Sequence, residues 1–367
     1  MLGLTGRQDF KFPACATTLT LAAIIFEHIM RIFPAAFILT LFFLTSCKNL
    51  KEHEWSALPE VTKISELQQT EFVPTLESPI NGNKNVVYAT AFLFAWDKVK
   101  QELKLPIALT DRNSDEFKLV NQSASYKNTM TDNEYSAEVE TVDDVIIARA
   151  FFNKTLPFPS RLQKIEKPIL FNNTNVLAFG IQSYDEEAAK FTEIVYYKND
   201  DNFILKLTPK DKEHQILLAK GLDKVANLMA AVEQTKKLTN AGSKERTSPK
   251  VAWKYVLNDI DIFSIPTIKF NIEANYSDIE GQTFTTKGNL HHVEVAYQRT
   301  GFILNENGAV VESEASFALD SASAEPVKIV PKKMLFDKPF FVIIKRANSN
   351  NPYFVMYVQN TELLTKE

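Results

Sequence analysis

Residues 145–152 read Val-Ile-Ile-Ala-Arg-Ala-Phe-Phe, a run that contains a single charged residue. A nearly continuous apolar run of this length is typical of a β-strand covered on both faces. Residues 268–273 alternate between apolar and polar side chains, which predicts a half-buried strand. Two further apolar runs, Phe340–Ile344 and Tyr353–Val358, flank an Asn-Ser-Asn-Asn-Pro turn and predict a terminal hairpin. The fold is therefore expected to be built around β-sheets.

Two segments predict helices that accompany these strands. Residues 85–103 are apolar on all sides in their first half and amphipathic in their second, as in a helix that enters a core after an Asn85 cap. Residues 222–238 place their apolar side chains on one helical face. A few helices among many strands predict an α+β fold with mixed sheets. No change in composition divides residues 81–367, so we expect one domain there.

The composition of the 367 residues is that of a globular protein, with 45% hydrophobic residues, 23% charged residues and a formal net charge of −4. It excludes a disordered chain, a collagen-like fibre and a polybasic protein, and we expect no nucleic-acid partner. Glycine is scarce: 10 of the 367 residues are glycine, or about 3%, whereas ~7% is usual. Because phosphate-binding loops are rich in glycine, nucleotide chemistry is not expected.

The first fifty residues have the features of an export signal. An uncharged run of 13 residues, 32–44, follows Arg31. At about 1.5 Å per residue this run is too short to cross a hydrocarbon layer of ~30 Å. A basic start, a short apolar stretch and small residues before a cleavage point are typical of secretory signals. Leu-Thr-Ser-Cys at 44–47 resembles the bacterial lipobox, whose cysteine is lipidated and becomes the new N-terminus.

We therefore expect residues 1–29 to be an upstream extension or overlong leader, residues 30–46 a lipoprotein signal peptide and residues 47–80 a tether. Stable attachment to a membrane needs more than one lipid chain. A multiply acylated Cys47 would meet that requirement and attach the protein to a membrane. Lys48 follows the cysteine where an aspartate would favour the inner membrane, so we expect an outer-membrane or cell-surface location in the cell envelope. A buried apolar strand followed by a structural cysteine is the alternative interpretation.

No motif indicates catalysis. The sequence has no glycine-rich phosphate loop, no cysteine pair of a zinc site and no nucleophile elbow. His291 and His292 are adjacent, and neighbouring side chains on a strand point to opposite faces, so we expect one packed and one surface histidine. The aspartates at 143–144 and at 200–201 are also adjacent, so the two side chains of each pair are not expected to act together, and such pairs are typical of turns. We expect no enzyme activity, no catalytic residues, no cofactor and no metal.

From residue 290 onward the chain resembles a serpin, the family of serine protease inhibitors. Residues 293–309, with Gly-Phe-Ile-Leu-Asn-Glu-Asn-Gly at 301–308, resemble the strand that runs into the family's reactive loop at a Glu-x-Gly hinge. Phe-Asp-Lys-Pro-Phe at 336–340 is similar to the family's Phe-x-x-Pro-Phe signature, and residues 353–360 stand in place of its last strand.

The resemblance continues upstream. Ile-Pro-Thr-Ile-Lys-Phe at 265–270 resembles the family's (Val/Leu)-Pro-Lys-Phe segment. Residues 148–152 resemble the family's central strand, and Leu-Pro-Phe at 156–158 resembles the segment that follows this strand. The similarity covers roughly residues 140–364. Residues 105–140 are too few for the several helices that serpins carry there, so the resemblance is to a trimmed or divergent bacterial lipoprotein member.

The resemblance implies an exposed reactive loop that a serine protease cleaves and that then inserts as a new strand into a sheet. An inserting strand needs apolar residues at every second position, because alternate side chains face the core. After Gly308 the two alternate sets are Ala309, Val311, Ser313, Ala315, Phe317 and Leu319, and Val310, Glu312, Glu314, Ser316, Ala318 and Asp320. The first set is small to apolar and the second is mostly polar, so insertion would bury the first. We predict a hinge at Glu306, Gly308, Ala309 and Val311; an ordinary exposed loop with chance alternation is the alternative.

Two bonds are candidates for cleavage in this loop. Counting forward from Gly308 by the family's usual loop length reaches Ala322–Ser323, which would suit an elastase-like protease. Counting back from Pro339 reaches Lys328–Ile329, which would suit a trypsin-like protease. The two counts differ because this loop is longer than the family's common form.

The family's sheet-opening region usually pairs a histidine with an asparagine, and the register places Gln298 and Ala148 at these positions. The resemblance therefore implies a weakened or absent switch there. Two functions follow: a monomeric, surface-tethered suicide-substrate inhibitor of a serine protease, or a non-inhibitory serpin-like scaffold that binds other partners. A sheet-rich surface lipoprotein unrelated to serpins is the third interpretation.

Overall fold

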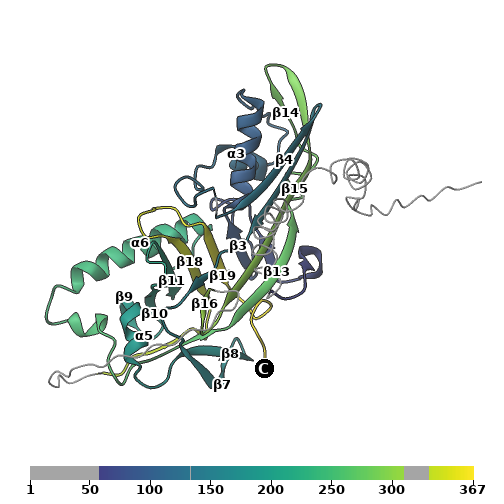
Figure 1. Cartoon of the computed structure of the whole chain (residues 1–367). Helices are drawn as coiled ribbons and strands as arrows, with labels where there is room; N and C mark the ends of the chain where they lie inside the picture. The colour runs from purple at the N-terminus through teal and green to yellow at the C-terminus, as the bar shows by residue number, and fades with distance from the viewer. Residues whose placement is uncertain (1–57, 133, 310–329) are drawn as a thin grey trace, which may run out of the picture. The chain divides into compact units, whose positions relative to one another are not determined.

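Strands dominate the part of the chain that the structure, a computed structural model, describes: residues 58–132, 134–309 and 330–367. They form sheets of six, seven and four strands and one two-stranded pair (Figure 1). The described helices are few, and their bounds are α3 (Ala91–Leu103), α4 (Asp115–Gln122), α5 (Glu186–Phe191) and α6 (Leu228–Glu245). Mixed sheets with few helices confirm the expected α+β fold class.

β5 (Val145–Phe152) and β15 (Asn289–Leu304) lie side by side and parallel in the six-stranded sheet, which we call the main sheet (Figure 1). The limits of β5 are those predicted from the sequence. Its side chains alternate between buried and half-buried, so the expected coverage on both faces is wrong: one face is buried and the other is partly open. The other strands of the main sheet are β1 (Thr62–Lys63), β13 (Ile268–Asn275), β14 (Thr283–Thr286) and β4 (Ser136–Val142).

The helix expected over residues 85–103 is a strand followed by a helix. Residues 85–89 form β3, and its Val-Val-Tyr-Ala residues pair with β19 and are buried on every side. β-branched and aromatic residues favour strands, and a run of them buried on both faces is typical of a central strand. The helical part, α3, begins at Ala91 and packs against β5 and β4 of the main sheet.

The seven-stranded sheet contains the expected terminal hairpin. β18 and β19 pair antiparallel, with Phe340 opposite Val358, which confirms the two closing strands and the turn between them. The bounds of the seven strands, in spatial order, are β2 (Thr70–Phe72), β3 (Asn85–Ala89), β19 (Phe354–Val358), β18 (Phe340–Arg346), β11 (His214–Lys220), β10 (Asn202–Leu207) and β9 (Thr192–Asn199).

α6 covers the β9 end of this sheet (Figure 1). The helix expected over 222–238 begins six residues later, because the side chain of Asn227 accepts a hydrogen bond from the backbone N–H of Ala230 and caps the helix there. It extends to Glu245, and the buried side chains on its inner face include Leu228 and Val232.

The remaining described strands form the four-stranded sheet and the two-stranded pair. β12 has β8 on one side and β17 on the other in the four-stranded sheet, and among the described strands β16 pairs with β6. Their bounds are β17 (Lys333–Leu335), β12 (Ile262–Pro266), β8 (Thr174–Ile181), β7 (Gln163–Phe171), β16 (Gly308–Ala309) and β6 (Leu156–Pro157).

Aromatic rings join the main sheet to the seven-stranded sheet. The ring of Phe354 in β19 stacks on Phe302 of β15 at 4.3 Å and on Phe152 of β5 at 5.6 Å, measured between ring centroids. Stacked rings of this kind add to the apolar area buried between the two layers. The core therefore lies between the β5–β15 pair and the terminal hairpin.

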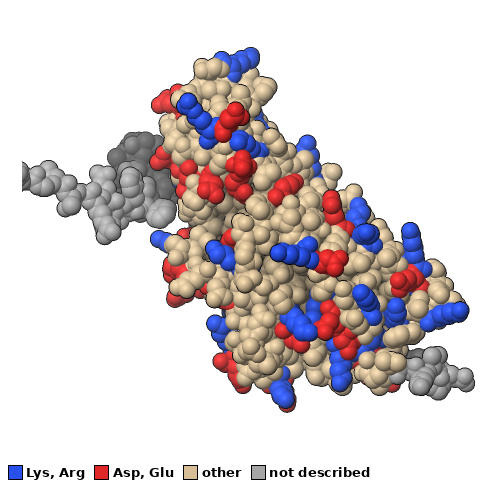
Figure 2. Space-filling model, turned by 180° about the vertical axis from the view of Figure 1, so that it is seen from behind, with Lys and Arg blue, Asp and Glu red and all other residues tan. Residues whose placement is uncertain are grey.

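The ordered domain begins before residue 81. Thr62 of β1 pairs with Ile272 of the main sheet, and Thr70 of β2 pairs with Asn85. The expected tether over 47–80 is therefore corrected for residues 58–80, because this stretch contributes β1 and β2 to two of the sheets. On the face of the molecule shown in Figure 2, basic and acidic side chains are interspersed without a large field of one sign.

Candidate functional site

The β5–β15 pair is a parallel seam between antiparallel neighbours. Its register runs from His292 opposite Val145 to Thr300 opposite Phe152, with one irregularity after Val293. Parallel pairing is slightly less stable per residue than antiparallel pairing. The other parallel ladder of the described main sheet, β1–β13, joins only two residue pairs, so this seam is its one long parallel ladder.

Small side chains lie beneath the seam. Ala148 is opposite Ala296, Ala150 is opposite Gln298, and all four residues are fully buried. Small residues at these positions leave room for the N-terminus of α3, which packs against β5. The floor of the seam is therefore a shallow surface of methyl groups with one amide.

Gln298 binds the start of α3 rather than a partner across the seam. Its Oε1 accepts a hydrogen bond of 2.9 Å from the backbone N–H of Phe92, and its Nε2 donates to Oγ1 of Thr300 at 3.0 Å. The N-cap residue of α3, Thr90, makes no side-chain cap bond, so Gln298 satisfies one of the open N–H groups of the helix. Ala148 offers no polar group, so Gln298 and Ala148 form no polar pair at the positions where the resemblance places the sheet-opening region.

The predicted hinge follows β15 directly. Asn305 and Gly308 exchange two backbone hydrogen bonds of 3.0 Å, which close a tight turn after the strand. The chain then pairs with β6, with Gly308 opposite Pro157 and Ala309 opposite Leu156. Ala309 is fully buried, so the hinge is packed against the domain up to the last residue described before the loop.

The position of Gly308 accepts only glycine. Its φ of +121° lies in a region that side chains rarely adopt. A Cβ atom would overlap the carbonyl oxygen of Leu156 and lie 2.8 Å from the backbone nitrogen of Phe158. The close approach of the two backbones in the β16–β6 pair therefore depends on this glycine.

Glu306 fastens the hinge through its side chain. The carboxylate is 8% exposed, and its Oε1 lies 2.7 Å from Nη2 of Arg161 and 3.1 Å from Nζ of Lys164. Burial raises the pKa of Glu306, but hydrogen bonds from Arg161 and Lys164 outweigh it and hold this pKa below its ordinary value. The carboxylate is thus an ionised anchor at the N-terminal end of residues 310–329.

A second anchor stands at the C-terminal end of the same segment. The Nζ atom of Lys332 lies 2.7 Å from Oδ2 of Asp261, and both side chains have no exposed surface. The backbone N–H of Lys332 donates to the other carboxylate oxygen at 2.8 Å, and Nζ also donates to the carbonyl of Trp253 at 3.3 Å. Sequence reasoning missed this pair, because the two residues are far apart in the chain and neither lies in a recognisable motif.

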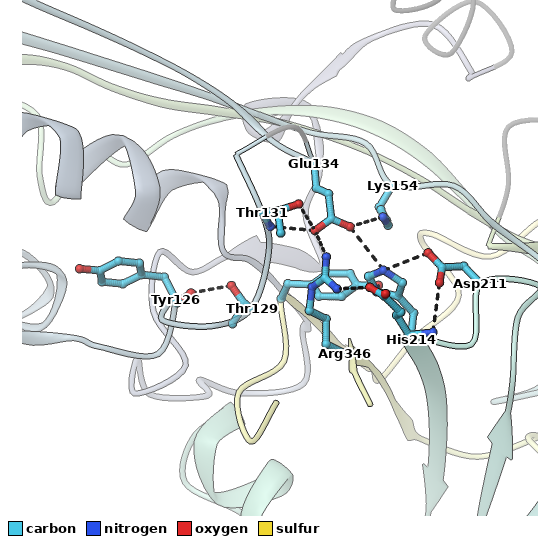
Figure 3. A network of polar contacts seen from close by, with 10 residues as sticks. Tyr126, Thr129, Thr131, Glu134, Lys154, Asp211, His214 and Arg346 are labelled. Carbon is cyan, nitrogen blue, oxygen red and sulfur yellow. Dashed lines mark hydrogen bonds and ion pairs between the residues drawn. The ribbon is translucent and has the colours of Figure 1, made fainter. Parts of the chain in front are cut away.

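A polar network holds the ends of β4 and β5 against the seven-stranded sheet (Figure 3). Glu134, just before β4, accepts hydrogen bonds from Lys154, just after β5, and from Arg346 at the end of β18. Burial raises the pKa of Glu134, but these bonds and the N–H of Thr131 lower it to about 2. The carboxylate therefore stays ionised and links strands of two sheets.

His214 stands at the centre of this network (Figure 3). Its Nε2 lies 3.3 Å from carboxylate oxygens of both Glu134 and Asp211, and its Nδ1 lies 3.0 Å from the hydroxyl of Tyr353. Burial and the nearby Lys154 lower the pKa of His214, so the ring is neutral at pH 7. Sequence reasoning missed this cluster, whose members come from separate segments of the chain.

The two adjacent histidines do not form one site. His291 is buried, and its Nε2 lies 2.6 Å from Oγ1 of Thr286, whereas the side chain of His292 is 40% exposed. One packed and one surface histidine are therefore confirmed. The pairs at 143–144 and 200–201 occupy the turns after β4 and β9, as expected.

Several predicted positions lie outside the described residues: Cys47, Val311, Ala322, Ser323, Lys328 and Ile329. Within the described ranges, no three His, Cys, Asp or Glu side chains are arranged to hold a metal ion. Among the helices of these ranges, none is long and apolar enough to cross a membrane.

No protein-family model and no curated protein matches the chain. Among solved structures it is similar to a serpin from the trematode Schistosoma haematobium, with 13% identity, a TM-score of 0.37, and coverage of 60% of this chain and 58% of that chain. It is also similar to the thermophilic serpin tengpin in its native state, with 12% identity, a TM-score of 0.34, and coverage of 60% of this chain and 57% of that chain.

The chain thus spans less than two thirds of either serpin. In the part of the chain that the structure describes, residues 305–309 follow β15 directly and β18 and β19 form a terminal hairpin, the order that the sequence resemblance implies. The described strands and helices make up an α+β fold with mixed sheets.

Proposed function

We propose that the protein is a serpin-type inhibitor of a serine protease, with residues 310–329 as the loop that the protease cleaves. After cleavage, the N-terminal part of this loop would insert between β5 and β15. The observation that carries the proposal is the parallel seam itself, which lies beside the hinge at Gly308.

The seam has the right geometry for one added strand. A chain that leaves the end of β15 and turns back would run antiparallel to both β15 and β5. One parallel ladder would then be replaced by two antiparallel ladders, which doubles the pairing and uses the more stable type. The eight residues of β5 span about 26 Å at ~3.3 Å per residue, and the twenty residues 310–329 are long enough to fill this length.

The floor of the seam fits the side chains that would enter it. Ala148, Ala150 and Ala296 present only methyl groups, and the alternate set that begins at Ala309 and Val311 is small or apolar. Burial of apolar area contributes roughly 25 cal/mol per Å². The alternation in the sequence therefore supports a strand whose inner face matches this floor.

Two anchors explain why insertion would wait for cleavage. Glu306 holds one end of residues 310–329 and the Asp261–Lys332 pair holds the other. A loop fixed at both ends cannot enter the seam along its full length. Cleavage releases the N-terminal part from the far anchor, so that only the hinge contacts of Glu306, Gly308 and Ala309 remain to be broken.

Incubation with an elastase-like and with a trypsin-like serine protease tests the proposal. The expected result is a covalent adduct that survives denaturing gel electrophoresis, with the loop cut at Ala322–Ser323 for the first protease or Lys328–Ile329 for the second. The matched control is the same protease with its active-site serine blocked, which should give no adduct. Cleavage of the loop without an adduct for either protease would contradict an inhibitory function.

A non-inhibitory serpin-like scaffold is the second candidate function, and one observation favours it. Gln298 is bonded to the start of α3, and Ala148 offers no partner across the seam, so the sheet-opening region has no polar switch. A scaffold would use the fold to bind other proteins. Clean cleavage of the loop with no adduct and no gain in heat resistance is the result expected for it.

We also propose that the protein is a monomeric lipoprotein of the outer membrane or cell surface, attached through Cys47. The support is the Leu-Thr-Ser-Cys motif after a short apolar run. Substitution Cys47→Ser should move the protein from the membrane fraction to the soluble fraction. Retention of this variant in the membrane fraction would contradict the anchor.

A further inference from the structure

A cavity of about 580 Å³ opens beside the hinge. We propose that it binds a small multivalent oxyanion, of the tricarboxylate or phosphate class. Its polar lining includes Arg161, Lys164, Lys269, Asn305, Glu306 and Asn307. Cavities of a few hundred Å³ are the size in which proteins hold small molecules.

The lining carries more positive than negative charge. Arg161, Lys164 and Lys269 contribute three positive charges, and Glu306 contributes one negative charge. Both partners of Glu306 use the same carboxylate oxygen, and Lys269 has no ion pair among the described residues. Two positive charges of the lining therefore remain without a counter-charge in the described structure.

Arg161 and Lys164 have more N–H donors than their contacts with Glu306 use. The side chain of Arg161 is 56% exposed and that of Lys164 is 68% exposed, and each directs one nitrogen to Glu306. A guanidinium has five N–H donors and an ammonium has three. An oxyanion can therefore accept hydrogen bonds from both residues and from Lys269 while Glu306 keeps its partners. Such charge-assisted bonds are roughly twice as strong as neutral ones.

The size of the cavity and the charge of the protein favour a small anion over a long polyanion. A polyanion would follow a continuous basic stripe. The chain has a formal net charge of −4, and basic and acidic side chains are interspersed on the face shown in Figure 2. A compact anion needs only the local excess of positive charge inside the cavity.

A bound anion would join three separate parts of the fold. Arg161 lies just before β7 and Lys164 lies in β7. Lys269 lies in β13, and Asn305 lies in the hinge. The regulatory part of the inference rests on the proposed function: if the hinge leaves its place when the loop inserts, one wall of the cavity is lost. By linkage, the anion then stabilises the uninserted protein.

Calorimetric titration and thermal melts with citrate and with inorganic phosphate test the site, at an ionic strength held constant with sodium chloride. We expect saturable binding and a melting temperature raised by about 2–4 °C near saturation. Substitution Lys269→Gln should weaken binding about tenfold, as the loss of one charge-assisted bond predicts. The matched control is Lys167→Gln on β7, outside the cavity, which should leave binding unchanged. No saturable heat with either anion, or equal affinity in the two variants, would overturn the site.

Loop-cleaved protein separates this inference from the proposed function. Weaker anion binding after cleavage supports the regulatory part, because the hinge has moved. Unchanged binding after cleavage would overturn the regulatory part and leave the site itself in place. Absence of binding to the intact protein overturns the site without bearing on protease inhibition.

Discussion

The Nζ atom of Lys332 lies 2.7 Å from Oδ2 of Asp261, and water reaches neither side chain. A buried ion pair is stable only when further hydrogen bonds compensate for the lost hydration. Here the backbone N–H groups of Lys332 and Asn258 both donate to the carboxylate at 2.8 Å. The pair therefore fixes the chain three residues after the loop segment 310–329.

Substitution Lys332→Met should lower the free energy of unfolding by about 3–5 kcal/mol, because it leaves the carboxylate of Asp261 buried without its counter-charge. Lys338→Met is the matched control, since Lys338 pairs with Asp201 and both side chains are more than half exposed. An exposed pair contributes about 0–1 kcal/mol. Urea denaturation measures both values, and equal losses in the two variants would refute the role of the buried pair.

Substitution Gly308→Ala should destabilise the protein by about 2–4 kcal/mol, since it combines an unfavourable φ with overpacking against the β6 backbone. Gly281→Ala is the control: Gly281 also has a positive φ, of +79°, but no atom lies within 4 Å of its Cβ position. Only the cost of the backbone conformation, roughly 1 kcal/mol, is expected there. If chemical denaturation gives the same loss for both, the β16–β6 contact does not constrain the hinge.

The alternation of the loop can be tested with two arginine substitutions in neighbouring positions. Ser313→Arg places a charge in the set expected to face the core, whereas Glu314→Arg places it in the set expected to face solvent. The first variant should lose adduct formation and be cleaved as a plain substrate, because a buried charge blocks insertion. The second should still form the adduct. Loss of the adduct in both variants, or in neither, would contradict the register.

Acid should weaken the network around His214. The pKa of His214 is lowered in the folded protein, so the unfolded chain takes up the proton more readily and stability falls as the pH drops through about 6.5. Glu134, with its pKa lowered to about 2, adds stability above about pH 4.5 that is lost at lower pH. Melting temperatures from pH 8 to pH 5 should therefore fall less steeply for His214→Gln than for the unaltered protein.

His292→Gln is the control for this pH series, because it removes a half-exposed imidazole that bonds to Glu294 and lies outside the network. Its pH dependence should follow that of the unaltered protein. A steeper fall for His214→Gln, or the same change in both variants, would show that the network is not the acid-sensitive element.

Periodic patterns predicted the strands better than the boundaries of helices. The limits of β5 and the terminal hairpin follow from apolar runs and a turn, and the structure has them where the sequence places them. The prediction of one helix over 85–103 is wrong because Val86–Ala89 is apolar throughout, a pattern that a buried helix and a buried strand share. Val86–Ala89 forms a strand because it pairs with β19, which is distant in the sequence.

The candidate site was predictable only where it lies in one continuous stretch. Glu306, Gly308 and Ala309 stand in one stretch that the sequence resemblance predicts to be a hinge, and the structure gives them partners. The Asp261–Lys332 pair depends on the parallel pairing of β12 with β17, which no local pattern encodes. The network around His214 likewise joins residues that meet only after the sheets have packed.

The most direct test of the account is the melting temperature before and after a single cut within residues 310–329, with mass spectrometry to locate the cut. If the freed segment enters the seam between β5 and β15, two antiparallel ladders replace one parallel ladder, and the cleaved protein should melt at a clearly higher temperature than the intact protein. A cleaved protein that melts at the same temperature or lower would contradict insertion.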